Sequence, residues 1–356
     1  MEVKKLLLDS KKDCEQWDSF VSSFEHGHHH STPFIEGAIH TFKHTNESLY
    51  CVLGDKIVAV LPLVHIKSPI FGDSLTSLPF YNYGGILSNN NLATALLIEK
   101  SKHLASTLKV KSFQLRQSSE LPELITQGAQ LETHKVNMHL QFPDDISMIG
   151  AGNGKKRAKL RSQATLAVRK SEELGLGLEH RFGHLELVDD FYYVFSRHMK
   201  FLGTPVYDKK FFIDLLKTMK AEAQIIVSYV NDTPSSCGFM FMHKDMMSIP
   251  WASCLVEHNH LSLNANMYYN ILLRAYNLGF KKFDFGRSTL DANTYKFKMQ
   301  WGAEPQQCYW YTFSDEKIES ASAPQNGKFG LAVKIWKKLP LPVANFIGPY
   351  IVKQIA

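Results

Sequence analysis

The order of β-rich and helical runs in the first half of the sequence recurs in the second half, and this repeat constrains the fold most strongly. In the first half, two β-rich runs flank Gly54-Asp55, a pair typical of hairpin turns. A third run covers residues 77–87, a helical spacing of leucines covers 92–108, and strand character returns over 112–116. This order predicts a hairpin, a third strand, a helix and a closing strand.

The second half has the same order of elements. Two β-rich runs flank Asn231-Asp232, and a third run covers residues 246–256. A helix is expected over residues 264–278 and a closing strand over 282–285.

Two short matches support a duplication. The word SLPF begins at Ser77 and SIPW begins at Ser248, an offset of 248 − 77 = 171. The words KSFQLR and KKFDFGR contain Phe113 and Phe283, an offset of 283 − 113 = 170. Because the offsets are nearly equal, we interpret the chain as two copies of one unit.

Each copy predicts an α/β domain with a mixed, mostly antiparallel sheet flanked by helices. The helix before the closing strand supplies the crossover that a parallel strand pair requires, and ligands bind beyond the carboxyl ends of such strands. The stretch GAGNG at residues 150–154 marks the boundary between the copies. We therefore predict domains over residues 1–149 and 150–320, with a tail over 321–356 that docks on the body.

Length and composition agree with two globular domains. The chain has 356 residues, of which 44% are hydrophobic and 21% charged. A net charge of +6 permits an anionic substrate without requiring nucleic acid, and we expect no DNA partner. The five cysteines are scattered, and neither a spanning segment nor a signal peptide is recognisable, so we expect a cytoplasmic protein with reduced thiols.

Residues 283–301, FDFGRSTLDANTYKFKMQW, hold the strongest chemical signal. Asp284 and Arg287 flank a glycine at the end of the closing strand, and Lys298 follows. Such a cluster can position an amine and stabilise the oxyanion that forms when the amine attacks an acyl ester. An internal ion pair with aromatic packing is the alternative. The matching first-half strand, SFQLR, lacks the Asp–Gly–Arg combination, which assigns the chemistry to the second half.

The third strand and the next helix of the second half contribute to the same predicted site. Trp251 either lines a pocket or packs in the core, and Asn264 is alternatively the N-cap of the helix. The predicted substrate-binding residues of this half are Trp251, Glu257, Asn264, Asn266, Tyr295, Lys296 and Trp301.

An aromatic stretch in the first half ends in paired glycines. Tyr81, Asn82 and Tyr83 are predicted to bind a sugar or peptide acceptor by stacking, whereas packing between the two halves is the simpler interpretation.

Two further features are interpreted as structural. A run of basic residues without acids is a solvated helix face, with a polyanionic ligand such as a nucleotide-sugar or RNA phosphate as the alternative. The run comprises Lys155, Lys156, Arg157, Lys159, Arg161, Arg169 and Lys170. His26, His28, His29 and His30 have no carboxylate partners at ligand spacing, so we predict no metal site.

The tail from residue 331, LAVKIWKKLPLPVANFIGPYIVKQIA, is apolar, basic and interrupted by prolines. It either docks on the body of the protein or rests on a membrane surface, which would make the protein peripheral at the inner membrane. Docking is the simpler interpretation.

Several long segments resemble the FemAB-related proteins associated with exosortase/PEP-CTERM systems of Gram-negative bacteria. They are PFYNYGG, RHMKFLGTPVYDKKFF, IPWASCLVEHN, FDFGRST and TYKFKMQWGAEP, and the similarity runs nearly end to end, including WKKLPLP in the tail. The resemblance implies tandem GNAT-like domains. Fem enzymes transfer an amino acid from aminoacyl-tRNA to an amine of a peptidoglycan precursor. In this resemblance YKFKMQWG matches a Fem motif with a lysine near the acyl-transfer centre, which implies that Lys298 stabilises the tetrahedral intermediate.

The sequence lacks the long helical arm that some Fem proteins insert. In addition, Gram-negative bacteria generally lack the peptide bridges that Fem proteins build, so the acceptor of the classical enzymes does not carry over directly. The acceptor implied is therefore a cell-envelope precursor or, equally, an exopolysaccharide precursor. GNAT enzymes that use coenzyme A usually bind its pyrophosphate on a glycine-rich loop before the helix, but residues 257–264 read EHNHLSLN. We therefore expect no tightly bound cofactor and a donor such as aminoacyl-tRNA.

Three hypotheses follow. The first is an acyltransferase that acts at a cleft between the halves. The second is a non-catalytic protein that binds a glycan precursor, and the third is an N-acetyltransferase that uses acetyl-CoA. Separated strands at Trp251 and Asp284 would favour catalysis, whereas burial and mutual pairing of Asp284, Arg287 and Lys298 would favour a scaffold.

Overall fold

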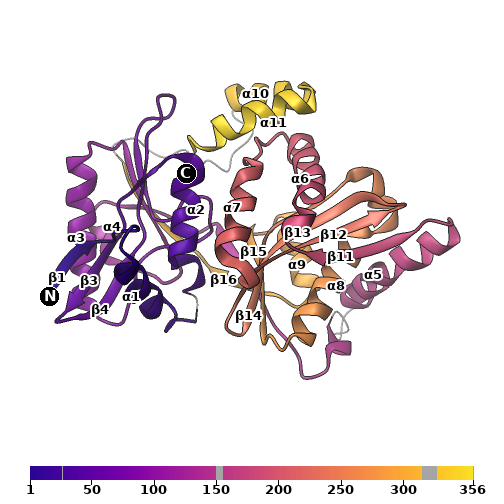
Figure 1. Cartoon of the computed structure of the whole chain (residues 1–356), viewed down its shortest axis with the longest axis horizontal. Coiled ribbons are helices and arrows are strands. Elements are labelled where there is room, and N and C mark those ends of the chain that lie inside the picture. The colour runs from indigo at the N-terminus through magenta and orange to yellow at the C-terminus, as the bar shows by residue number, and fades with distance from the viewer. Residues whose placement is uncertain (26, 150–154, 315–326, 356) are drawn as a thin grey trace. The chain divides into compact units, whose positions relative to one another are not determined.

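The computed structural model describes the whole chain except residues 26, 150–154, 315–326 and 356 (Figure 1). The chain forms two compact units, each assembled from separate stretches. Unit 1 comprises Met1–Lys135, Gln307–Asn326 and Tyr350–Ala356, and unit 2 comprises Val136–Gln306 and Gly327–Pro349.

Unit 1 contains two sheets and four described α-helices. The first sheet has the order β1 (Glu2–Lys5), β3 (Leu49–Leu53), β4 (Lys56–Leu61) and β7 (Leu87–Ser88). The second has the order β2 (Thr45–Asn46), β5 (Val64–Ile66), β6 (Ser74–Thr76), β8 (Ser112–Gln117), β17 (Tyr309–Ser314) and β9 (Gln130–Glu132). The helices are α1 (Lys11–Val21), α2 (Thr32–Phe42), α3 (Asn91–Thr107) and α4 (Glu123–Thr126).

Unit 2 contains one seven-stranded sheet. Its order is β11 (Leu178–Gly183), β12 (Ala223–Val230), β13 (Thr233–His243), β14 (Met246–Cys254), β15 (Lys282–Thr289), β10 (Lys135–Gln141) and β16 (Glu304–Gln307). Its helices are α5 (Lys155–Glu173), α6 (Val188–Leu202), α7 (Lys209–Met219), α8 (Leu263–Asn277), α9 (Asn293–Gln300), α10 (Gly327–Lys338) and α11 (Leu341–Val352), the last of which ends in unit 1.

Most predicted elements are confirmed. Asn231 and Asp232 both have positive φ, 48° and 59°, as the tight turn between β12 and β13 requires. The third strand predicted over residues 77–87 is wrong. β6 ends before it, and Leu78 and Phe80 have φ values of 44° and 74°, which no regular strand accommodates.

Two strands lie in the sheet of the other half of the sequence, so the compact units differ from the linear boundaries at residues 149 and 320. β10 precedes residue 149 but completes the sheet of unit 2 between β15 and β16. β17 precedes residue 320 but pairs with β8 and β9 in unit 1. A tail beginning at residue 321 is likewise divided, because Gly327–Pro349 belongs to unit 2 and Tyr350–Ala356 to unit 1.

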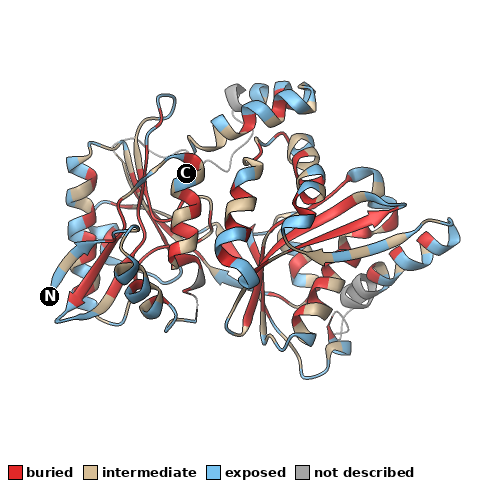
Figure 2. Cartoon of the chain, viewed as in Figure 1, coloured by how far each residue is buried: buried red, intermediate tan, exposed pale blue. Residues whose placement is uncertain are grey.

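The sheet of unit 2 is covered on both faces, and the buried residues concentrate in its central strands (Figure 2). One face packs against α5 and α8, and includes Phe283 and Phe285 of β15. A separate aromatic cluster joins α6 and α7 to β13 and β14, for example Phe212 and Phe239 with ring centroids 5.5 Å apart. Burying large apolar and aromatic surfaces of this kind is the main stabilising term for such a sheet.

β14 and β15 are parallel neighbours that pair only at their beginnings. Their register is Met246↔Lys282, Met247↔Phe283 and Ser248↔Asp284. Beyond Ser248 no further pair joins the two strands among the described residues, although β14 stays paired with β13 as far as Cys254. The strands therefore separate directly after Asp284.

Candidate functional site

A local irregularity of β15 builds the candidate site in unit 2. Gly286 has a φ of +74°, a conformation that favours glycine because a Cβ would be strained there. Its N–H donates to Asp284 Oδ1 at 2.7 Å. The Lys298 ammonium, one helix later on α9, donates to Gly286 O at 3.0 Å and to Arg287 O at 2.9 Å. A carboxylate and an ammonium are therefore anchored on the same turn of backbone.

Asp284 also faces a histidine from the neighbouring strand β10. His139 Nε2 lies 3.6 Å from Asp284 Oδ2, with the carboxylate 1% and the imidazole side chain 15% exposed. Burial alone would lower the pKa of His139, but the negative charge of Asp284 at 3.6 Å outweighs burial and raises that pKa. His139 thus titrates above its ordinary range while in contact with a buried carboxylate.

The pKa of the Lys298 ammonium is lower than that of an ordinary lysine. Lys298 is only 7% exposed, and burial lowers its pKa to about 8, partly opposed by Asp284 and assisted by the positive charge of Arg287. An ammonium has three N–H donors, and among the described residues Gly286 O and Arg287 O accept two of them. One N–H is left to bind a developing negative charge.

These groups have complementary chemical capacities. The His139–Asp284 pair can accept and hold a proton, because the carboxylate stabilises the imidazolium. The Lys298 ammonium can stabilise an oxyanion, and its low exposure strengthens that interaction relative to one in water. Perturbed ionisable groups with a defined partner are typical of functional sites.

The other predicted residues of the segment 283–301 lie around this cluster in different environments. Arg287 is exposed at its side chain and contributes its carbonyl oxygen to Lys298. On α9, Lys296 is exposed and Tyr295 is half-buried. Trp301 is 1% exposed and packs edge-on against Phe297, so its ring belongs to the core of unit 2.

The predicted residues on β14 and the following connection are not drawn into the Asp284 cluster by any described contact. Trp251 is 8% exposed and its ring packs against Phe211 and Phe212 in the aromatic cluster. Glu257 is exposed on a 3-10 turn. Asn266 is buried and donates to Ala164 O at 2.7 Å, which ties α8 to α5.

The N-terminus of α8 has part of its amide groups occupied by partners within the chain. The helix begins after Ser262, so Asn264 is not the N-cap. The N–H of Ser262 donates to Asn259 O and that of Ala265 to Ser262 O. Two of the four amides that usually bind an anion at a helix start, those of Ser262 and Ala265, thus have partners within the chain.

The predicted aromatic residues of the first half lie inside unit 1. Tyr81 and Tyr83 are each 2% exposed, and their rings lie 5.5 Å and 4.6 Å from the His29 ring. The carbonyl of Asn82 accepts a hydrogen bond from Trp310 at 3.2 Å. These contacts are those of a packed aromatic core.

The remaining polar features lie apart from this chemistry. In the basic run, Lys155–Arg161 have side chains outside the described residues, Arg169 pairs with Glu173 at 3.4 Å, and Lys170 donates to His260 O. Of the four N-terminal histidines, residue 26 and the side chain of His28 lie outside the described part. No group of three metal-ligating residues occurs among the residues that the structure describes.

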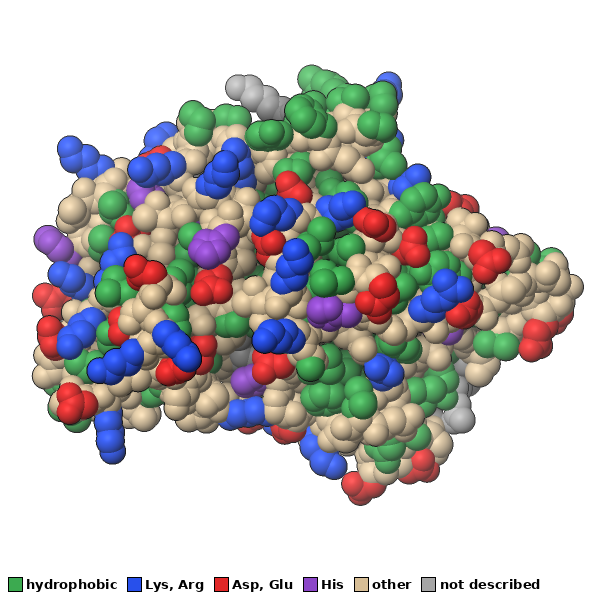
Figure 3. Space-filling model, viewed as in Figure 1, with side chains coloured by type: hydrophobic (Ala, Val, Ile, Leu, Met, Phe, Trp, Pro, Cys, Tyr) green, Lys and Arg blue, Asp and Glu red, His purple; other side chains and the backbone are tan. Residues whose placement is uncertain are grey.

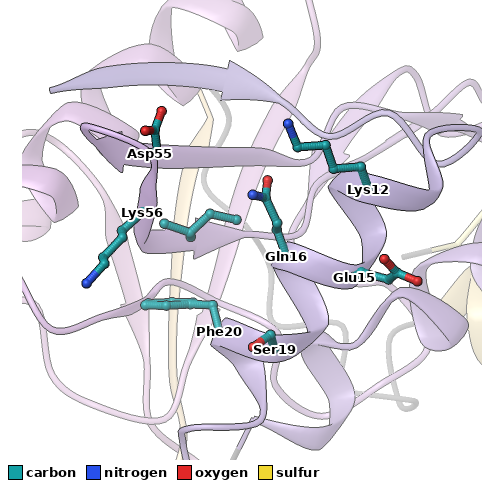
Figure 4. A pocket seen from close by; sticks show the side chains of 8 residues that line it. Lys12, Glu15, Gln16, Ser19, Phe20, Asp55 and Lys56 are labelled. Carbon is teal, nitrogen blue, oxygen red and sulfur yellow. The ribbon is translucent and has the colours of Figure 1, made fainter.

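A shallow groove in unit 1 offers little chemistry. It lies between α1 and the β3–β4 hairpin, and Figure 4 shows that charges of both signs line it. Lys12 and Lys56 alternate there with Glu15 and Asp55, so the groove presents no single charge to a ligand.

His139 is a candidate site residue that the sequence did not point to. The strand KVNMHLQ alternates, with Val136, Met138 and Leu140 in the core, so Asn137 and His139 share the opposite face. That alternation was readable in the sequence. The neighbour of the strand was not, because β10 pairs in the sheet of the other half.

Comparison with known proteins identifies the fold of the chain. Residues 157–298 match the family described as acetyltransferase (GNAT) domain. The matched region ends at Lys298 and contains Asp284, Gly286 and Arg287. A search of curated proteins gave no match.

Solved structures share the fold over nearly the whole chain. FemX has 12% sequence identity and a TM-score of 0.65, with 87% of this chain and 97% of FemX covered. A tandem GNAT protein from the clavulanic acid biosynthesis pathway has 10% identity and a TM-score of 0.57, with 89% and 99% covered. The C-terminal DUF2156 domain of a protein from Agrobacterium fabrum has 10% identity and a TM-score of 0.57, with 92% and 95% covered.

The protein therefore has the fold of the tandem GNAT and FemX structures, and the predicted fold class is confirmed. At these identities the structural likeness defines the fold. Together with the matched GNAT domain, it supports an acyltransferase with an acyl donor and an acceptor.

Proposed function

We propose that this protein transfers an aminoacyl or acyl group to an amine or hydroxyl of a cell-envelope or exopolysaccharide precursor, with the chemistry at Asp284, His139 and Lys298. The observation that carries the proposal is the buried Lys298 ammonium, held by two carbonyl oxygens beside the Asp284–His139 pair. The resemblance to FemAB-related proteins of exosortase/PEP-CTERM systems supports the choice of acceptor.

The reaction proposed is a nucleophilic substitution at an ester carbonyl. The acceptor nitrogen or oxygen attacks the carbonyl carbon, and the Lys298 ammonium stabilises the oxyanion of the tetrahedral intermediate. His139, paired with Asp284, takes the proton that the acceptor loses. The intermediate then collapses, the ester C–O bond breaks, and the proton passes to the leaving oxygen.

We propose an aminoacyl-tRNA or another activated acyl ester as the donor, which sets the reaction in the cytoplasm. The amides of Ser262 and Ala265 at the start of α8 donate within the chain, which disfavours coenzyme A, because its pyrophosphate would compete with those two contacts.

A second candidate function is a non-catalytic protein that binds a glycan precursor. The burial of Asp284 and Lys298 favours it, because buried and satisfied charges also serve as structural elements. The two functions differ in one respect: the binding protein retains its cellular role when Lys298 is replaced by an isosteric apolar residue.

The test is mass spectrometry of acceptor pools from cells that carry the wild-type gene, no gene, or Lys298→Met. We expect an added acyl or aminoacyl mass with the wild type only, and a loss of about 10²–10³-fold in Lys298→Met. Because Lys298→Met leaves Gly286 O and Arg287 O without their donor, the variant should lose about 1–3 kcal/mol of stability, so thermal melting must show it folded before its product is compared. Lys281→Met, at an exposed position before β15, is the matched control and should retain the product. An equal product level in Lys298→Met would contradict the proposal.

A further inference from the structure

The C-terminal helices α10 and α11 turn large apolar side chains outward. Leu331 and Ile335 of α10 are 60% and 55% exposed, and Phe346 of α11 is 71% exposed. Val343 and Ile347 are also exposed, and the spacing along each helix puts these side chains on one face. Figure 3 shows hydrophobic side chains gathered over α10 and α11 at the top of the view. We name Leu331, Ile335, Val343, Phe346 and Ile347 the tail apolar face.

The opposite side of α11 carries its small residues. Ala344 is 2% exposed and Gly348 is buried. A Cβ at Gly348 would lie 2.9 Å from Val206 N and 3.0 Å from Val206 O, so only glycine permits this close approach. In an ordinary water-exposed helix the large apolar residues turn inward. Here tight backbone packing fixes the reverse arrangement.

The orientation of α10 is fixed as well. Lys200 on α6 donates to Lys337 O at 2.9 Å, and the Trp336 ring is buried on the side away from solvent. Leu331 and Ile335 are therefore exposed because the docked helix holds them on its outer side, and their exposure does not come from a loose end of the chain.

The charge around the tail apolar face is entirely positive in sequence. Residues 327–356 contain five lysines and no Asp or Glu. Lys334 and Lys338 are exposed and follow Leu331 and Ile335 by three positions, so the ammonium groups border the apolar side chains. Apolar side chains bordered by lysines fit the boundary between acyl chains and anionic headgroups, where long lysine side chains reach the phosphates.

We propose that the tail apolar face docks on the surface of an anionic phospholipid bilayer. Phe346, Leu331 and Ile335 would enter the headgroup region, and Lys334 and Lys338 would contact phosphates. None of the described helices has the length and apolar character that a bilayer-spanning segment requires. The docking rests on no step of the proposed reaction, so each stands or fails separately.

Co-sedimentation of the full chain with vesicles tests the proposal. We expect binding to vesicles of phosphatidylglycerol and phosphatidylcholine, weakening with added salt, and at least 10-fold weaker binding to phosphatidylcholine alone. Leu331→Ser combined with Phe346→Ser should weaken binding at least 10-fold. Lys334→Gln combined with Lys338→Gln should weaken binding and remove most of its salt dependence. Ile70→Ser, at a position 67% exposed in unit 1, is the control that should bind like the wild type.

Three results would overturn the proposal. Two of them are absence of wild-type binding to anionic vesicles and equal binding by the serine variants. Because the replaced side chains are exposed, circular dichroism should show folded variants, and Phe346→Ser alone serves if the double variant is unfolded. The other is a dimer, measured by light scattering without lipid, that Phe346→Ser converts to a monomer, since a second copy would then be the occupant.

Discussion

The two units present the same pair of parallel strands with different residues at the critical position. In unit 1, β6 and β8 pair through Leu75↔Phe113 and Thr76↔Gln114. In unit 2, β14 and β15 pair through Met247↔Phe283 and Ser248↔Asp284. The register places Gln114 and Asp284 at equivalent positions, each directly after a buried phenylalanine.

The partners of these two residues differ in charge. Gln114 Nε2 donates to Thr312 Oγ1 of β17 at 3.1 Å, a hydrogen bond between neutral groups. Asp284 faces His139 of β10, the strand that occupies the corresponding place in the sheet of unit 2. One architectural position is therefore neutral in one unit and ionisable in the other.

A second difference lies two residues further along each strand. Arg116 of unit 1 donates to Tyr81 O at 3.0 Å and lies over the Trp310 ring at 4.5 Å. Its counterpart in unit 2 is Gly286, which has no side chain and whose carbonyl oxygen accepts a hydrogen bond from the Lys298 ammonium. Unit 1 commits its buried cation to packing, whereas unit 2 holds a cation with a lowered pKa. Two strand ends of the same topology therefore carry different polar groups, neutral in unit 1 and ionisable in unit 2.

The largest effect is expected from making the second unit resemble the first. Asp284→Asn should lower acyl transfer about 10²-fold, because His139 loses the carboxylate that stabilises its protonated form. His139→Gln should have an effect of the same size, and the double variant should be no worse than either single variant, since the pair acts as one unit. Product formation measured by mass spectrometry checks this. Additive losses would separate the two residues functionally.

The same pair predicts a pH dependence of stability. His139 has a raised pKa, so its ion pair with Asp284 contributes fully below the unfolded pKa of about 6.5. That contribution is lost as the pH rises through the folded pKa. Chemical denaturation at several pH values should show the wild type losing this increment above pH 6.5 and His139→Gln lacking the slope. A slope that persists in the variant would assign it to another group.

A smaller effect is expected at Gly286, where the backbone of unit 2 differs from that of unit 1 at Arg116. Gly286→Ala should destabilise the fold by about 1–2 kcal/mol, because φ of +74° is strained for an L-residue. It should also lower acyl transfer, since the carbonyl groups that hold Lys298 shift. Thermal melting and product measurement check both. Gly279→Ala, also at positive φ but with nothing within 4 Å of its Cβ, is the control for strain without loss of transfer.

The smallest effect is expected in unit 1. Gln114→Ala removes one hydrogen bond to Thr312 and one from Arg116, and should cost about 1 kcal/mol of stability. Acyl transfer should be unchanged once the protein is folded. A loss of transfer comparable to that of Asp284→Asn would end the assignment of chemistry to unit 2 alone.

Much of the fold was readable from local patterns. The hairpin turns, the crossover helices and the near-equal offsets predicted two similar α/β units, because alternation and helical spacing are local properties. The exchange of β10 and β17 was not predictable, because alternation identifies a strand but not the sheet it joins. The break after β6 was hidden as well, since Leu78 and Phe80 give no signal for positive φ.

The site was predictable only in part. Asp284 stood out because it lies at a strand end next to Gly286 and Arg287, and Lys298 because YKFKMQWG resembles the Fem motif. Their partner His139 depends on the exchanged strand and was missed. Trp251 and Tyr81 illustrate a different limit, since an aromatic side chain has the same sequence signature in a core and in a pocket.

The most direct test of the central claim is an NMR titration of the Lys298 ammonium in protein with labelled lysine, which requires no substrate. We expect a pKa of about 8 in the wild type, well below that of exposed lysines, and a still lower value in Asp284→Asn because Asp284 favours the charged form. The resonance is assigned by its absence from Lys298→Met. An ordinary pKa near 10.5, unaffected by Asp284→Asn, would contradict the claim that unit 2 holds a reactive buried cation.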